Sequence, residues 1–210
     1  MTIIRNQDGS ITLGADRLPG SVWGSNLRAI LPTSRWVALS RRTAERAGRV
    51  CKVCNQPSFY GEGTRNPDSH EIWEFDGHGS HPVQRLVGVI ALCGACHETQ
   101  HSGLAELNDR WDSVIATLCR VNGWDRADAE ADIERSRERY RHLSNIEWDL
   151  DLTLLEGWVT LDGYPDLLIP SEDRATLGNT LDKTKRKLSL IVGAEIPDTI
   201  WRCRSGRVGI

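Results

Sequence analysis

The chain has 210 residues, enough to bury a core in one or two domains. Its 26 basic and 29 acidic residues give a net charge of -3, so any contact with nucleic acid must come from local basic patches rather than from the overall charge. The sequence has no apolar run of membrane-spanning length and a polar start unlike a secretory signal, so we expect a cytoplasmic protein without membrane contact.

The first element that we expect is a hairpin over Ile3–Leu13, because Asp8-Gly9 suits a tight two-residue turn. It makes residues 1–19 an appendage to the main domain. A helix should follow from Thr33 or Ser34, either of which can cap it, through Arg46, with Gly48 just past its end.

The predicted helix carries the densest positive cluster before the first cysteine pair. The basic residues that we consider are Arg35, Arg41, Arg42 and Arg46. This cluster is a candidate surface for the phosphates of a nucleic acid. A solvated helix face with ordinary surface arginines explains the pattern equally well.

Two Cys-x-x-Cys pairs indicate a metal site. Cys51 and Cys54 form the first pair, and Cys93 and Cys96 form the second. Four thiolates are enough to close a tetrahedral zinc site that has no open position, so we predict a structural zinc. His97 directly follows the second pair and His101 lies four residues further on, so either one could instead replace a cysteine in a Cys₃His site.

The stretch between the cysteine pairs predicts two strands. Ser69–Asp76 and Leu86–Leu92 are short and rich in β-branched, aromatic or other apolar residues, and a loop rich in Gly, His and Pro separates them. A helix should start near the second cysteine pair, which would place His97 and His101 one turn apart on the same face. The expected order is therefore strand, loop, strand and helix.

This segment resembles the zinc-knuckle HNH, or ββα-metal, endonucleases of bacteria and phages. The resemblance rests on the cysteine pairs, the His70-Glu71-Ile72-Trp73 segment and the Leu92-Cys-Gly-Ala-Cys-His-Glu-Thr-Gln-His101 segment, and it covers roughly residues 20–110. It implies an α+β fold with a ββα-metal core, a four-cysteine structural zinc, flanking helices and a small C-terminal α/β segment. It also implies hydrolysis of phosphodiester bonds in double-stranded DNA, including nicking, with Mg²⁺ or another divalent cation.

Phosphodiester hydrolysis requires a base that activates water and a cation that neutralises phosphate charge. By the resemblance, His70 is the general base, His97 binds the catalytic cation, and His101 is a second ligand or a phosphate contact. Where many relatives have Asp-His or His-His, this chain has Ser69-His70-Glu71. Glu71 could therefore be the base and His70 a metal ligand.

The asparagine of the family motif has no counterpart in Gly88–Ala91. Gln84, His78 or His81 could compensate for its loss. The missing asparagine keeps a second function open, namely a zinc-stabilised module that binds nucleic acid or protein and has lost cleavage.

Apolar residues recur at helical spacing after His101, and we expect all of them to be core residues: Leu104, Leu107, Trp111, Ile115 and Leu118. A charged helix should follow over 126–142, and 148–155 alternates like a strand. We place the nuclease-like domain at residues 20–143 and a C-terminal accessory region at 144–210.

Overall fold

The computed structural model describes the chain except for residues 1–2, 6–10, 61, 79–80, 178–189 and 202–210. Its centre is a four-stranded sheet in the order β5-β6-β7-β9. The strands are β5 (Asp68–Asp76), β6 (Val83–Leu92), β7 (Asp149–Asp151) and β9 (Leu168–Ile169). β5 pairs antiparallel with β6, whereas β7 runs parallel to β6. The described part of the protein is therefore a mixed α+β fold, as predicted.

Within the described residues, three two-stranded sheets lie around this centre. They pair β1 (Ile3–Arg5) with β2 (Ile11–Leu13), β3 (Ser58–Tyr60) with β4 (Gly63–Arg65), and β8 (Val159–Leu161) with β10 (Leu190–Val192). The two strands of the predicted N-terminal hairpin are confirmed, and its Asp8-Gly9 turn lies outside the described residues.

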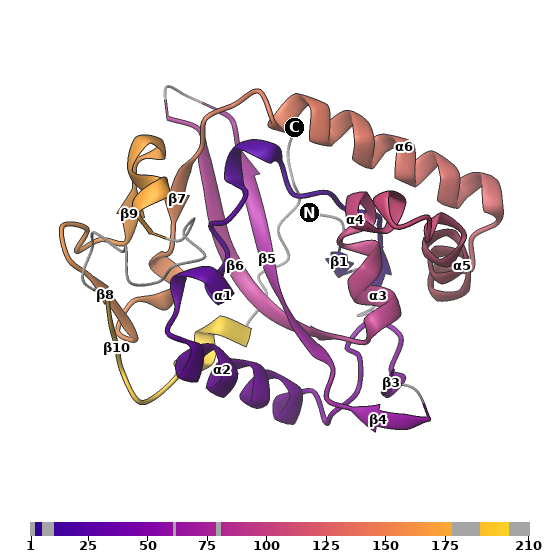
Figure 1. Ribbon diagram of the computed structural model, residues 1–210, viewed down its shortest axis with the longest axis horizontal. Coiled ribbons are helices and arrows are strands. Elements are labelled where there is room, and N and C mark those ends of the chain that lie inside the picture. The colour runs from indigo at the N-terminus through magenta and orange to yellow at the C-terminus, as the bar shows by residue number, and fades with distance from the viewer. Residues whose placement is uncertain (1–2, 6–10, 61, 79–80, 178–189, 202–210) are drawn as a thin grey trace.

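The helices cover the sheet from two sides (Figure 1). The short α1 (Leu27–Ile30) leads into α2 (Thr33–Arg46), which packs against β5 and β6. On the other side lie α3 (Gly94–Thr99), α4 (Ser102–Leu107), α5 (Trp111–Asn122) and α6 (Arg126–Leu143). Short 3₁₀ turns occur at Gly20–Val22, Thr153–Leu155, Ser171–Thr176 and Asp198–Trp201. Among the described residues, none of the helices combines the length and apolar character needed to cross a bilayer.

Two main apolar cores hold these layers together. One lies under α2 and the sheet and includes Leu39, Trp73 and Leu150. The other lies under α3 and α5 and includes Leu92, Cys96 and Leu118. β5 and β6 contribute to the first core and the end of β6 enters the second, so this strand pair links the cores. Whether residues 144–210 form a separate region stays a prediction, although β7 completes the central sheet through its pairing with β6.

The predicted apolar stripe after His101 is wrong in its first half. Leu104 is 58% exposed and Leu107 is 85% exposed, while Ile115 and Leu118 are buried. The helix is interrupted at His101, whose backbone is not helical, and again at Asp109, whose φ is 55°. Each break resets the direction in which side chains project, so one helical spacing does not carry through from α4 to α5.

Two other boundaries differ from prediction. Pro32, not Thr33 or Ser34, occupies the cap position of α2, which fits because a proline backbone near φ -54° can lead into the first turn without donating a hydrogen bond. The strand expected over 148–155 is shortened to β7, because Thr153–Leu155 forms a 3₁₀ turn. In that turn, Asp151 Oδ1 accepts hydrogen bonds from the Thr153 amide at 2.9 Å and the Thr153 hydroxyl at 2.7 Å.

Candidate metal centres and adjoining cavity

The four predicted zinc ligands come from two separate segments. Cys51 and Cys54 lie on the turn after α2, Cys93 follows β6, and Cys96 is on α3. Within the turn, the Asn55 amide donates to the Cys51 carbonyl at 2.9 Å, and Asn55 has the left-handed φ of 56°. The Lys52 amide donates to the Ala91 carbonyl at 2.9 Å, which ties the turn to the end of β6. Backbone contacts therefore hold the two cysteine pairs against each other.

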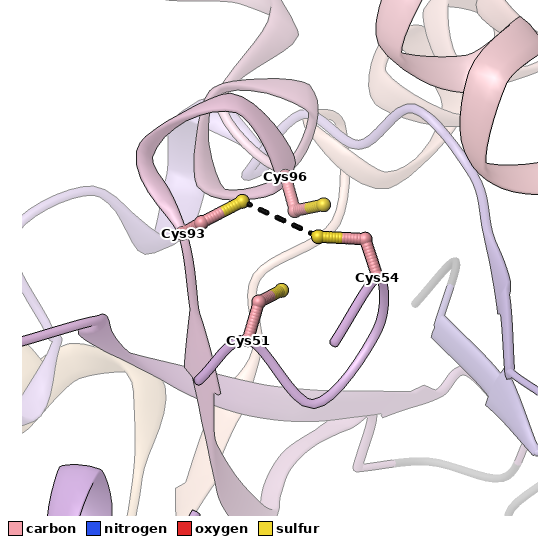
Figure 2. A group of neighbouring side chains, drawn as sticks. All are labelled: Cys51, Cys54, Cys93 and Cys96. Carbon is pink, nitrogen blue, oxygen red and sulfur yellow. Dashed lines mark hydrogen bonds between the residues drawn. The ribbon is translucent and has the colours of Figure 1, made fainter. Parts of the chain in front are cut away.

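The four cysteine sulfurs lie within 4.8 Å of one another and point toward a common centre (Figure 2). The Sγ atoms of Cys54 and Cys93 are 3.7 Å apart. Zinc–sulfur bonds of about 2.3 Å give a tetrahedral site sulfur–sulfur edges of about 3.8 Å. The spacing therefore suits a structural metal such as zinc.

The electrostatics of the cluster also favour a cation. Hydrogen bonds from Cys93 and Cys96 lower the pKa of Cys51. The same contacts with Cys51 raise the pKa of Cys93 to about 11 and also raise the pKa of Cys96. Crowded sulfurs thus resist losing several protons together, because each new thiolate repels the first. A divalent cation at the centre would remove that repulsion and stabilise four thiolates.

Three histidines form a second cluster close to the first. His70 is on β5, His97 is on α3, and His101 is the N-cap residue directly before α4. One ring nitrogen from each histidine lies within 4.8 Å of one ring nitrogen of the other two, and the Nε2 atoms of His97 and His101 are 3.2 Å apart. The fold thus brings the three histidines into one cluster and the four cysteines into another. Neither His97 nor His101 lies among the sulfurs.

The surroundings of His70 and His101 favour neutral imidazoles. Burial, and then the neighbouring His97 and His101, lower the pKa of His70 well below its ordinary value. Partial desolvation of its ring, and then the neighbouring His97, lower the pKa of His101 to about 4. The Nδ1 atom of His70 is buried and makes no hydrogen bond within the described protein. Neutral rings with free nitrogen lone pairs can bind a metal ion or accept a proton.

Asp68 contacts the three-histidine cluster, although the sequence analysis did not select it. Its Oδ2 lies 3.4 Å from Nδ1 of His97, and it also accepts a hydrogen bond from Arg65 at 2.8 Å. The contact with His97 lowers the pKa of Asp68, so the carboxylate stays ionised. Holding Nδ1 leaves Nε2 of His97 facing His101. Asp68 lies two residues before His70 on the same strand, and this spacing was the available signal.

Glu71 lies half-buried beside α1. Its Oε1 accepts a hydrogen bond from the Leu27 amide at 2.9 Å, and Leu27 is the first residue of α1. Burial raises the pKa of Glu71. A base there would have the raised affinity for a proton that general-base catalysis uses, but the same carboxylate also holds the start of α1. Glu71 and His70 border the same cavity.

That cavity has a volume of about 660 Å³ and opens beside all three histidines. Arg41 lines it, as do Arg17 and Arg28, which the sequence analysis did not select. Arg35, Arg42 and Arg46 are not among the described lining residues, because spacings of seven and four put them on another face of α2. Arg46 instead bonds Asp198 at 2.8 Å and stacks 4.7 Å from the Trp201 ring centre.

The residues considered as substitutes for the missing asparagine lie elsewhere. Gln84 is buried and accepts a hydrogen bond from Arg174, and His81 lies 3.7 Å from Asp149. Neither of them, nor His78, is among the described residues that line the cavity. Asn26 and Asn66 do line it. Asn26 caps α1 and Asn66 accepts a hydrogen bond from Arg49 at 2.9 Å, so both amides already hold backbone or side-chain partners.

Comparison with known proteins adds no relative: no family model, no curated protein and no solved structure matches this chain. The functional argument therefore rests on the chemistry of the two clusters and the cavity beside them.

Proposed function

We propose that this protein is a metal-dependent endonuclease of the HNH type that hydrolyses phosphodiester bonds in DNA. The observation that carries the proposal is that His70 on β5, His97 on α3 and His101 in the turn before α4 meet at the side of one cavity. His70 lies on the first strand of the β5–β6 pair and His97 on the helix that follows this pair, an order that supports a ββα-metal core. The adjoining arginines supply the positive charge that a phosphate backbone requires.

His97 and His101 are the proposed ligands of the catalytic cation. Metal–nitrogen bonds of about 2.1 Å place neighbouring nitrogens about 3.0 Å apart in an octahedral site and about 3.4 Å apart in a tetrahedral one. The 3.2 Å between their Nε2 atoms fits this range. A divalent cation there would neutralise charge on the phosphate and the leaving oxygen. Asp68 would orient His97 through Nδ1, as carboxylates commonly do for metal-binding histidines.

His70 is the proposed general base. Its lowered pKa keeps the ring neutral, and its buried Nδ1 has no hydrogen-bond partner among the described residues. A neutral ring can accept the proton of an attacking water. The four-cysteine site would serve this chemistry indirectly, since a zinc there would fix Cys96, and with it the start of α3, against the end of β6.

A second candidate is a module that binds nucleic acid or protein without cleaving it. The lack of an asparagine in Gly88–Ala91 favours this candidate. It predicts that the wild type and a His70→Ala variant both bind nucleic acid or protein, and that neither cleaves DNA.

The deciding experiment is cleavage of supercoiled plasmid with Mg²⁺, Mn²⁺ or Ni²⁺. His70→Ala should lower the rate by about 10²- to 10⁴-fold, the usual contribution of a general base. His142→Ala is the matched control, because His142 is exposed on α6 far along the chain from the cluster. Equal rates for wild type and His70→Ala would refute the proposed role of His70, and an inert wild type would refute the endonuclease.

A further inference from the structure

The cavity beside the histidines also has an apolar part in its lining. This part is largely aromatic and includes Leu18, Trp36, Trp73 and Phe75. Trp36 comes from α2, while Trp73 and Phe75 come from β5. One continuous cavity therefore joins three imidazoles to a group of aromatic side chains.

Trp36 is the aromatic residue best placed to contact a ligand. It is half-buried, packs against the core under α2 and also lines the cavity. Trp73 is more deeply placed, with 8% of its surface exposed, and Phe75 makes an edge-on contact with Trp148 at 5.0 Å between ring centres. A half-buried indole at a cavity is a common platform for a flat aromatic ligand such as a nucleic-acid base.

Charged and polar groups in the same cavity complement a nucleotide. Arg28 and Arg41 are exposed and line it, and Ser40 lies beside Arg41 on α2. In a chain of net charge -3, these arginines concentrate positive potential locally. The cavity volume of about 660 Å³ lies within the range of small-molecule sites.

We infer that this cavity receives one unpaired nucleotide, with its base against Trp36 and its phosphate toward the three histidines. This inference rests on the proposed function and specifies its substrate as DNA that has a base outside the helix. A stacked, paired base offers only its edges in the grooves, so it must leave the stack before its face can meet an indole. Single-stranded, bulged or mismatched DNA should therefore be preferred to perfect duplex.

The test is binding of oligonucleotides that carry 2-aminopurine at one position. A single strand, a duplex with that base in a one-nucleotide bulge, and the perfect duplex share one sequence. They are titrated into the full-length wild type without added catalytic cation. The single strand and the bulged duplex should bind more tightly than the perfect duplex, with 2-aminopurine fluorescence quenched by stacking.

Trp36→Ala should weaken binding of the unpaired substrates by about 5- to 150-fold, the range for loss of one stacking contact, and Trp36→Phe should retain most of the affinity. Trp23→Ala is the matched control, because Trp23 is 74% exposed and is not among the described lining residues. If Trp36→Ala unfolds, Ser40→Phe tests the same site by filling the cavity, and it should produce a comparable loss.

Equal affinity for the perfect duplex and the unpaired substrates would overturn the inference, as would a Trp36→Ala variant that binds like Trp23→Ala. The result is separable from the endonuclease assay. Plasmid cleavage together with equal binding of all three oligonucleotides would reject the nucleotide site and leave the endonuclease. Selective, Trp36-dependent binding by a protein that never cleaves would support the site and reject the endonuclease.

Discussion

His97 and His101 approach to 3.2 Å between their Nε2 atoms although a break in the helix separates them. The His101 amide still donates to the Glu98 carbonyl at 3.0 Å, so a tight turn preserves the one-turn stacking that a continuous helix would give. Two ring nitrogens at this distance can share a proton, and they can equally bind one cation. The predictions below separate the roles of this pair from those of the surrounding residues.

His97→Ala should weaken binding of the catalytic cation and leave binding of the structural zinc unchanged. The Mg²⁺ or Mn²⁺ concentration needed for half-maximal cleavage should rise. Asp68→Asn removes only the partner that orients His97, and it should raise this concentration by about 10- to 100-fold. His97→Ala removes the ligand itself and should raise it further. His101→Ala should show the same defect more mildly. Zinc content, measured on each purified variant, should stay at the wild-type value. Loss of the tightly held zinc from His97→Ala would instead make His97 a structural ligand.

Cys54→Ser should unfold or aggregate, because the cysteine site joins segments too short to be stable alone. Structural zinc of this kind contributes about 10 to 16 kcal/mol in small peptides at neutral pH. Elemental analysis of the wild type should find about one tightly bound zinc per chain. Cys119→Ser is the control, since Cys119, on α5, donates to the carbonyl of Asp125 and lies outside the cysteine cluster. A folded wild type without zinc would contradict this prediction.

Glu71→Gln distinguishes the two candidate bases. If His70 is the base, Glu71→Gln should retain most cleavage activity, because glutamine can still accept the hydrogen bond from the Leu27 amide. His70→Ala should then lose cleavage while DNA affinity and zinc content stay close to wild type, since a base acts in the transition state. Activity that survives His70→Ala and is lost in Glu71→Gln would transfer the role to Glu71.

Leu118→Ala should destabilise the protein by about 2 to 5 kcal/mol, because Leu118 is fully buried in the core under α5. Leu107→Ala should change stability by less than about 0.5 kcal/mol, since its side chain is largely in water. Chemical denaturation at constant zinc measures both. Comparable losses would mean that Leu107 is buried in solution, against its 85% exposure.

Glu106→Gln should reduce stability at neutral pH by about 1 kcal/mol or less, as expected for an exposed ion pair. Hydrogen bonds from Arg17 and Arg137 lower the pKa of Glu106 in the folded protein. A carboxyl whose pKa is lowered in the folded state stabilises the folded protein at pH values above its unfolded pKa of about 4.3. This stabilisation is lost as the pH falls through the folded pKa. The wild-type advantage should thus shrink in acid. Glu156→Gln, at an exposed carboxylate, is the control, and an advantage that grows in acid would contradict the sign.

Several features could be predicted from local sequence because short-range physics decides them. The two Cys-x-x-Cys spacings indicated a metal site, and β5, β6 and the start of α3 followed from strand composition and the cysteine turn. The strand β6 nevertheless begins at Val83, three residues earlier than Leu86, because its pairing with β5 extends to Asp76. Local composition does not encode that partner.

Other features depended on the tertiary fold. Arg17 and Arg28 reach the histidine cavity from segments remote in sequence, and Arg41 separates from the other arginines of α2 because helix geometry turns it to another face. Leu104 and Leu107 were predicted to be core residues from their spacing, but the helix interruptions on either side of α4 direct them toward solvent. Sequence by itself determined which residues could bind metal and which segments could form strands. Only the packing of distant segments decided which side chains share a cavity, because that depends on contacts formed after the chain has folded.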